Sequence, residues 1–220
     1  MNANGFEKLH GIDEMDEKQV LTLCRTAEWL TRQKLSGTIE LYRPVKVQTG
    51  RTPRQTGARR IRRTNVMKRI GILGAGTWGM ALARMLTVSG NDVLVWSAIE
   101  KEIDSLSTTR KHPNLPQMKI PDELRFTKSI EEVCKDKDIL LFAVPSVFVR
   151  STAAKARPYV ADGQIIVDVA KGIEPDTLYT MTEILADELG KEGGPKGVRL
   201  VALSGPTHAE EVAIDLPTTI

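Results

Sequence analysis

A glycine-rich turn constrains the fold of this chain more than any other feature. Gly74, Gly76 and Gly79 make the pattern G-x-G-x-x-G, which stands between the apolar run Ile70–Leu73 and the helix-like stretch Trp78–Ser89. In a strand–turn–helix unit the first glycine permits the tight turn, the second leaves room for a pyrophosphate, and the third lets helix and strand pack closely. The start of the helix offers N–H groups and partial positive charge to phosphates. The turn therefore predicts a dinucleotide site; a glycine-rich turn of no functional consequence is the alternative.

Strands and helices are expected to alternate along the rest of the chain. Ile139–Val144 is a continuous apolar run, which is typical of a buried strand in a parallel sheet. The further expected strands are 92–96, 124–127, 164–169 and 198–203. The further expected helices are 100–106, 148–156 and 176–189. Ser129 and Glu132 are expected to form a capping box that opens one more helix. This rhythm predicts an α/β fold, a Rossmann-type, doubly wound domain with a mainly parallel sheet. Asp215–Ile220 resembles a strand just beginning, which favours a cut at Ile220 over a natural end.

The first 66 residues have a different composition. They carry 13 Lys and Arg against 7 Asp and Glu, whereas residues 67–220 carry 18 against 21. A helix is possible over 13–34, but Thr49–Val66 holds six arginines and almost no large apolar side chain, which predicts a loose arm. We therefore expect a basic, poorly structured extension over 1–66 and an NAD(P)-binding domain over 67–220. A start codon misassigned upstream of Met67 would explain the extension. A nonspecific contact with nucleic acid or anionic membrane is the alternative, which the lack of aromatic residues among the arginines disfavours.

Composition excludes several other classes of protein. With 41% hydrophobic and 27% charged residues, the 220-residue chain is typical of a soluble globular protein. No apolar run approaches the ~18 residues of a membrane span, and no secretory signal opens the chain. Cys24 and Cys134 are far apart and lack metal-ligand spacing, so neither a structural disulfide nor a metal site is expected. A cytoplasmic protein fits these features.

The sequence leaves the choice between NADP and NAD open. A carboxylate about 20 residues after the glycine turn would hold the ribose hydroxyls of NAD and repel the extra phosphate of NADP. Ser97 and Ala98 occupy that place and do neither strongly, while Glu100 comes slightly late. Lys101 could favour NADP, although a solvated helix residue is the alternative interpretation.

Three later strands end in residues suited to a ligand. Pro145 is expected to shape the wall near the cofactor, or merely to stop its strand. Lys171 follows a buried strand, and its ammonium could hold a substrate phosphate or polarise a carbonyl; a solvated loop lysine is the alternative. In Ser204–Thr207 the backbone N–H groups and the Thr207 hydroxyl precede a short helix and could receive an anion or a cofactor amide. His208 could serve as an acid–base group, but we expect a surface residue there.

Four motifs in this order carry a family resemblance. They are Gly74–Gly79, Ala143–Ser146, Ala170–Gly172 and Ser204–Thr207. Together, from about Lys68 to Ile220, they resemble bacterial-type NAD(P)-dependent glycerol-3-phosphate dehydrogenase. The resemblance implies reversible reduction of dihydroxyacetone phosphate to sn-glycerol 3-phosphate for glycerophospholipid synthesis. A homodimer fits the full-length protein, and the composition of the arginine-rich segment argues against a nucleic-acid partner.

The resemblance also implies roles for individual residues. The expected cofactor-binding residues are Gly74, Gly76, Thr77, Trp78, Gly79, Pro145, Lys171 and Ala209, and the expected substrate-binding residues are Lys171, Gly205 and Thr207. The proton-transferring lysine of the family is expected in a helical domain beyond Ile220, so this chain should bind cofactor and turn over little. Ala98 departs from the basic or polar residue frequent at its position, which argues against a strong NADP preference.

Two rival functions remain open at this point. Another dehydrogenase of the same superfamily would share the glycine turn, but the motif after Leu203 suits the glycerol phosphate enzyme best. A non-catalytic dinucleotide-binding module with a basic nucleic-acid arm is the rival from another class, and salt-dependent binding of nucleic acid to residues 1–66 would identify it.

Overall fold

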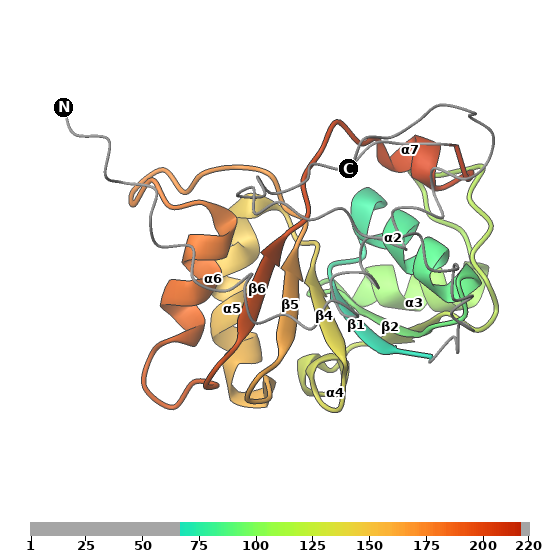
Figure 1. Ribbon diagram of the computed structural model, residues 1–220. Helices are drawn as coiled ribbons and strands as arrows, with labels where there is room; N and C mark the ends of the chain where they lie inside the picture. The colour runs from blue at the N-terminus through green and yellow to red at the C-terminus, as the bar shows by residue number, and fades with distance from the viewer. Residues whose placement is uncertain (1–66, 217–220) are drawn as a thin grey trace, which may run out of the picture.

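Residues 67–216 of the computed structural model are described, and they form one parallel sheet with helices on both faces (Figure 1). The strands are β1 (Arg69–Leu73), β2 (Asp92–Trp96), β3 (Arg125–Thr127), β4 (Ile139–Phe142), β5 (Ile165–Asp168) and β6 (Arg199–Ala202). Their order is β3-β2-β1-β4-β5-β6, and every neighbouring pair is parallel. This order confirms the doubly wound prediction: the chain adds strands outward on one side of β1, then crosses over to β4 and adds the remaining strands on the other side. The expected helix over 13–34 and the expected arginine arm lie outside the described residues.

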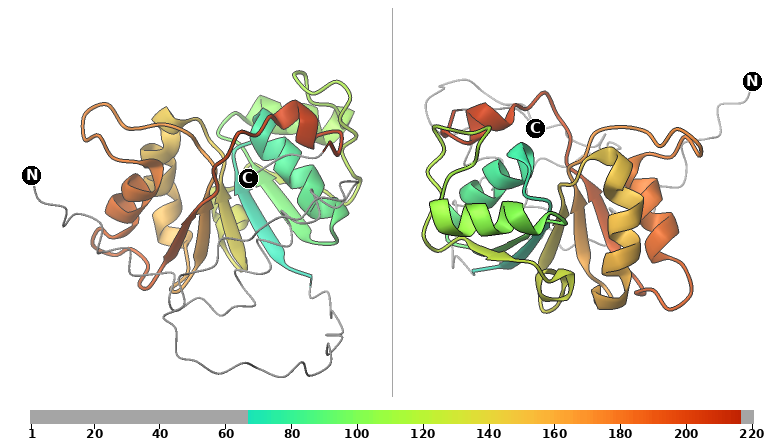
Figure 2. Two further views of the ribbon diagram at one scale, coloured as in Figure 1. Left: turned by 45° about the horizontal axis from the view of Figure 1, so that its top comes forward. Right: turned by 180° about the vertical axis from the view of Figure 1, so that it is seen from behind.

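Helices cover both faces of the sheet, so the strands are apolar on both sides. The helices are α2 (Thr77–Val88), α3 (Glu100–Thr109), α4 (Ile130–Cys134), α5 (Val149–Ala156), α6 (Met181–Leu189) and α7 (Ala209–Val212), with single 3-10 turns η1 (Ser146–Phe148) and η2 (Arg157–Tyr159). Figure 2 shows α2 and α3 on one face and α5 and α6 on the other. Successive residues of β1 supply both cores: Ile72 packs with the α2 and α3 residues and Leu73 with those of α4, α5 and α6. Both side chains are fully buried, as expected for a parallel sheet.

The predicted helix over 176–189 is wrong at its start. The helix begins at Met181, because Thr180 caps it: the Thr180 hydroxyl oxygen accepts the Glu183 N–H, and the Glu183 carboxylate accepts the Thr180 N–H at 2.7 Å. Before it, Leu178 has a left-handed backbone (φ 60°), and Ile173 pairs with Thr180 in an isolated bridge. Residues 176–180 therefore form a turn that closes the long loop after β5.

The capping box predicted for Ser129 and Glu132 is only half formed. The Ser129 hydroxyl oxygen accepts the Glu132 N–H at 3.2 Å, which starts the five-residue helix α4. The Glu132 carboxylate instead accepts a hydrogen bond from the Thr127 hydroxyl at 2.5 Å, and the Ser129 N–H donates to that same hydroxyl oxygen. The helix cap is thus tied to the end of β3.

The strand predicted over Asp215–Ile220 is wrong for its described part. Asp215 and Leu216 lie in a turn after α7, where Asp215 adopts φ 63°, and residues 217–220 lie outside the described part. Two hydrogen bonds from the Arg84 guanidinium, at 2.7 and 2.8 Å, hold the Asp215 carboxylate against α2. With Val212 and Ala213 buried, this ion pair docks α7 on α2, as Figure 1 shows.

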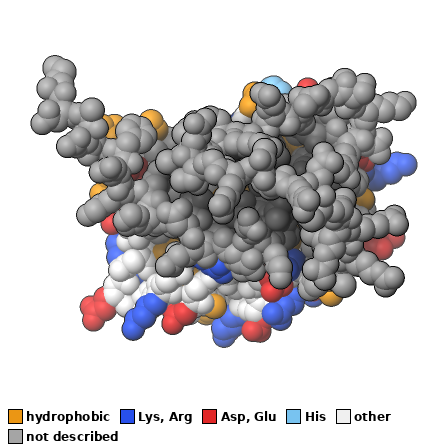
Figure 3. Space-filling model, viewed as in Figure 1, with side chains coloured by type: hydrophobic (Ala, Val, Ile, Leu, Met, Phe, Trp, Pro, Cys, Tyr) orange, Lys and Arg blue, Asp and Glu red, His pale blue; other side chains and the backbone are white. Residues whose placement is uncertain are grey.

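Charged side chains of both signs are mixed along the lower edge of the molecule, where the strands begin (Figure 3). Ion pairs join Arg69 to Asp138 and Arg125 to Asp92 at this edge. Exposed pairs of this kind add little to stability. Within residues 67–216, the helices are too short or too polar to cross a membrane.

Candidate functional site

The turn between β1 and α2 forms only with glycine at its first position. Gly74 adopts φ 123°, a conformation that side chains rarely tolerate, and a Cβ there would lie 2.5 Å from the Ala143 carbonyl oxygen. The Gly74 N–H donates to the carbonyl of Trp96, the last residue of β2, at 2.8 Å. The turn is therefore enclosed between the ends of β2 and β4.

The other two glycines differ in what surrounds them. A Cβ on Gly79 would lie 2.2 Å from the Gly74 carbonyl oxygen, so this position lets α2 pack directly on the turn. A Cβ on Gly76 would meet no atom within 4 Å. Gly76 is exposed and precedes the first turn of α2, which carries no acidic side chain. This open backbone beside a 12-residue helix's positive end fits a diphosphate.

Thr77 and Trp78 continue the turn into α2. Both are half-buried, and the Trp78 ring packs against the apolar core on the α2 face. Trp96 is buried against the opposite face instead, where its indole N–H donates to the Lys128 carbonyl at 3.1 Å. Trp78 is thus the better reporter of a ligand at this turn.

The ends of β4 and β5 meet behind the turn. Pro145 is exposed and precedes η1, so it ends the strand and directs the chain away from the sheet. Gly172 adopts φ 145°, and its Cβ position lies 3.0 Å from the Ser146 Cβ. The loop that carries Lys171 therefore packs directly on the residue after Pro145.

Lys171 joins the ends of β5 and β6. Its side chain is exposed, and its ammonium donates to the Gly205 carbonyl oxygen at 2.9 Å. The Thr207 N–H donates to the same carbonyl at 2.9 Å, and Thr207 is half-buried. The three residues predicted to hold the substrate are thus within one hydrogen-bonded cluster.

The two residues that follow the last motif, His208 and Ala209, lie in different surroundings. The Ala209 side chain is buried in the core on the α2 face, so a ligand would meet Ala209 through its backbone. His208 is exposed, and its side chain makes no cap hydrogen bond to α7.

Two carboxylates near Lys171 have shifted pKa values. Burial raises the pKa of Asp168, the last residue of β5, to about 6, against a hydrogen bond from the Ala170 N–H. Two hydrogen bonds from the Arg150 guanidinium, at 2.8 and 2.7 Å, lower the pKa of Glu174 to about 2. Arg150 also pairs with Asp187 of α6. These pairs fasten the loop after Lys171 to α5 and α6.

Sequence reasoning missed the polar pairs that shape the site. One is a hydrogen bond of 2.5 Å from the Ser97 hydroxyl to the Glu102 carboxylate, at the end of β2. Another joins Arg150 to Glu174 across 24 positions. Spacing gives no signal for such pairs, because they depend on how loops and helices pack.

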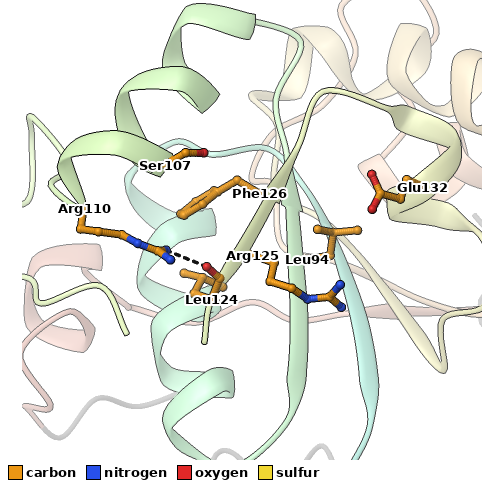
Figure 4. Close-up of a pocket in the computed structure, with 7 residues that line it drawn as sticks. All are labelled: Leu94, Ser107, Arg110, Leu124, Arg125, Phe126 and Glu132. Carbon is orange, nitrogen blue, oxygen red and sulfur yellow. Dashed lines mark hydrogen bonds between the residues drawn. The ribbon is translucent and has the colours of Figure 1, made fainter. Parts of the chain in front are cut away.

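A separate depression of about 270 Å³ lies between α3 and β3 (Figure 4). Arg110 crosses it, donates to the Leu124 carbonyl at 2.7 Å and lies over the Phe126 ring. None of the residues predicted to bind cofactor or substrate lines this depression.

Comparison with known proteins identifies a family. Residues 69–220 match the family model described as NAD-dependent glycerol-3-phosphate dehydrogenase N-terminus. Over 154 residues the chain is 69% identical to glycerol-3-phosphate dehydrogenase [NAD(P)+] 2 of Lactobacillus delbrueckii subsp. bulgaricus, covering 70% of this chain and 46% of the relative. It is 48% identical over 155 residues to glycerol-3-phosphate dehydrogenase [NAD(P)+] of Agathobacter rectalis, covering 70% and 44%.

A solved structure agrees with these matches. The crystal structure of glycerol-3-phosphate dehydrogenase from Coxiella burnetii superposes with a TM-score of 0.60 at 30% identity, covering 69% of this chain and 45% of that one. The chain therefore spans less than half the length of the relatives that it matches.

Proposed function

Since the chain belongs to the family of NAD-dependent glycerol-3-phosphate dehydrogenase N-terminal domains, we propose that residues 67–220 bind a nicotinamide dinucleotide. In a protein as long as the relatives, the proposed reaction is the reversible reduction of dihydroxyacetone phosphate to sn-glycerol 3-phosphate. The observation that carries the proposal is the open backbone at Gly76, enclosed by Gly74 and Gly79, at the N-terminus of α2.

The glycine turn is the proposed diphosphate site. The N–H groups at the start of α2, with Thr77 and Trp78 beside them, face the phosphates. Pro145 and the backbone of Ala209 are the further proposed contacts of the cofactor. This arrangement follows the rule that ligands of doubly wound sheets bind beyond the carboxyl ends of the strands.

The cluster of Lys171, Gly205 and Thr207 is the proposed substrate site. The Lys171 ammonium is exposed and already bound to a carbonyl oxygen, so it can exchange that acceptor for a substrate oxygen. The Thr207 hydroxyl can donate to the same ligand. The residues thus hold a phosphorylated hydroxyketone beside the cofactor.

A bound nicotinamide supplies or accepts the hydride in this reaction. The described residues position and polarise the substrate, and we propose that the proton comes from a lysine beyond Ile220. The 220-residue chain should therefore bind cofactor and oxidise NADH or NADPH with dihydroxyacetone phosphate slowly, if at all. Steady turnover by this chain in an absorbance assay at 340 nm would contradict that division of roles.

The first 66 residues are proposed to play no part in cofactor binding. A chain that starts at Met67 should then bind NADH as the 220-residue chain does. We propose that the full-length protein is a cytoplasmic homodimer; sedimentation of the purified full-length protein tests the dimer, and cell fractionation tests the location.

Replacing Gly76 with leucine tests the proposal. The added side chain starts in open space at φ −67°, so the protein should fold with little change in melting temperature. It would occupy the diphosphate site, so NADH affinity should fall by at least about tenfold, or 1.4 kcal/mol. Calorimetric titration measures the affinity, and thermal melting confirms the fold.

Ala161→Leu is the control, because it also places a leucine side chain at an exposed position, and Ala161 lies before β5, at the opposite end of that strand. It should leave NADH binding unchanged. Unaltered affinity in folded Gly76→Leu protein would refute the assignment of the turn.

A further inference from the structure

A carboxylate is fixed at the end of β2, where sequence spacing placed none. Ser97 directly follows β2 and is only 7% exposed, and its hydroxyl donates to Glu102 Oε2 at 2.5 Å. The Ile99 N–H donates to the same hydroxyl oxygen at 3.2 Å, which fixes the direction of the Ser97 side chain. This hydrogen bond holds the carboxylate of Glu102, on the first turn of α3, beside the carboxyl end of β2.

This carboxylate lies close to the glycine turn along the strand ends. The carbonyl of Trp96 accepts the Gly74 N–H at 2.8 Å, and Ser97 is the next residue. In doubly wound folds the adenosine ribose of the dinucleotide lies beyond the second strand, where a carboxylate binds the ribose hydroxyls. A phosphate on the 2′ oxygen of the ribose would be repelled by this carboxylate, because both groups are negatively charged.

The charges around Glu102 do not offset it. Lys128 lies 2.8 Å from Asp104 and 3.5 Å from Glu100, so its charge is already shared between two carboxylates. Lys101 is exposed and makes no ion pair within residues 67–216, and Ala98 supplies no charge. The start of α3 is therefore net acidic, and its exposed Ile99 offers an apolar surface to an adenine ring.

We propose that Glu102, positioned by Ser97, selects NAD over NADP. The inference rests on the proposed function and deepens it: the Glu102 carboxylate accepts hydrogen bonds from the adenosine ribose hydroxyls and excludes a 2′-phosphate. It assigns the cofactor choice to a residue on α3 rather than to a residue at the end of β2.

Two probes without nicotinamide isolate this end of the site. ADP-ribose and 2′-phospho-ADP-ribose are titrated calorimetrically into the 220-residue chain and into its Glu102→Gln variant. The unmodified chain should bind ADP-ribose at least about tenfold more tightly, and the variant should narrow that ratio by about tenfold, mainly through tighter binding of the 2′-phospho probe. Added salt should shrink the change, since it arises from charge.

Glu123→Gln is the matched control, because it removes the same charge from an exposed residue beyond α3. It should leave the ratio unchanged. Ser97→Ala keeps the carboxylate but frees it, so ADP-ribose affinity should fall while discrimination against the 2′-phosphate weakens less than in Glu102→Gln.

The outcomes separate the two proposals. If neither probe binds the folded chain, the proposed function fails and this inference fails with it. If both probes bind and Glu102→Gln shifts their ratio no more than Glu123→Gln does, the dinucleotide site stands and the role of Glu102 is refuted.

Discussion

Gly76 and Gly79 stand three positions apart and serve opposite needs. At Gly76 a side chain would enter the space proposed for a ligand, whereas at Gly79 it would collide with the Gly74 carbonyl. Gly79→Ala should therefore destabilise the protein by about 3 kcal/mol or more, since neither α2 nor the turn can move away freely. Gly76→Ala should change stability by less than about 0.5 kcal/mol. Urea unfolding monitored by circular dichroism measures both, and equal losses would contradict the geometry.

Asp168 should make stability depend on pH. Its folded pKa of about 6 lies above the ordinary value of 3.8 for an aspartate, so the folded protein holds the proton more tightly. The stability contributed by protonated Asp168 is then complete below pH 4 and is lost as the pH rises through 6. Two pKa units correspond to at most about 3 kcal/mol.

The Asp168→Asn variant isolates this effect. Asparagine keeps an acceptor for the Ala170 N–H, so the variant should melt at a higher temperature than the parent at pH 7.5 and close to it at pH 4. Asp162→Asn is a comparison at an exposed position on the other side of β5. A parent protein whose stability relative to Asp168→Asn does not change between pH 4 and 7.5 would contradict the raised pKa.

Single residues also show what a sequence pattern contains. The three glycines were predictable because each position has a local requirement: a tight turn at Gly74, open space at Gly76 and close packing at Gly79. The backbone at each position has the expected conformation or surroundings. Glu102 was not, because its position depends on the direction in which α3 leaves β2 and on a hydrogen bond to Ser97. Spacing alone counts residues along the chain and contains no information on that direction.

The loop between β5 and α6 is the element that presents Lys171. It leaves the sheet through Gly172, and Glu174 is fastened to Arg150 of α5 by two hydrogen bonds. The exposed apolar side chains of Ile173 and Leu178 add little anchoring. The ion pair is thus the main constraint on the loop.

Glu174→Gln should loosen this loop while the sheet stays intact. Amide hydrogen exchange should quicken over residues 171–179 and stay unchanged in β4 and β5, because the variant loses charge-assisted bonds to Arg150. In the parent, the low pKa of Glu174, about 2, means that the pair contributes stability above pH 4.5 and loses it as the pH falls toward 2. Exchange that remains slow in the variant would show that the Arg150–Glu174 ion pair does not hold the loop. Glu192→Gln, which removes a charge from an exposed residue after α6, is the control.

Elements were predictable in their interiors and less so at their ends. All six expected strands are present, and the clearest apolar runs marked β1, β4 and β5, since a strand buried on both faces is apolar almost throughout. The helix over 176–189 began too early in the prediction because Asp176 and Thr177 suggest a helix start as well as Thr180 does. The helix starts after Thr180 because Thr180 and Glu183 form a reciprocal capping box and because Thr180 pairs with Ile173 in an isolated bridge.

At the scale of the whole molecule, one ion pair joins the turn after α7 to α2. Arg84 and Asp215 are 131 positions apart, and the Arg84 Nε is buried with no hydrogen-bond partner among the described residues. Asp215→Asn should destabilise the protein by about 1 to 2 kcal/mol, because the guanidinium keeps its charge and loses its carboxylate. Arg84→Met with Asp215→Asn should recover part of that loss.

Thermal melting of the two single variants and the double variant tests this coupling as a mutant cycle. Lys155→Met, at an exposed position on α5 away from this pair, is the control for loss of a positive charge. Strictly additive losses would show that the pair contributes nothing to docking α7. No pattern in the sequence pointed to this contact, since its partners meet only after the complete sheet has formed.

The close approach of Gly74 to Ala143 also governs when the site can exist during synthesis. The first strand leaves the ribosome early, but its hydrogen-bonded neighbour β4 follows much later; Arg69 and Asp138, which bond across these strand starts, are 69 positions apart. Until β4 emerges, the glycine turn lacks the Ala143 backbone against which it packs, and one hydrogen-bonding edge of β1 stays unpaired. Affinity for a nucleotide should therefore appear abruptly as the polypeptide lengthens past Ala143, which stalled chains of graded length would reveal.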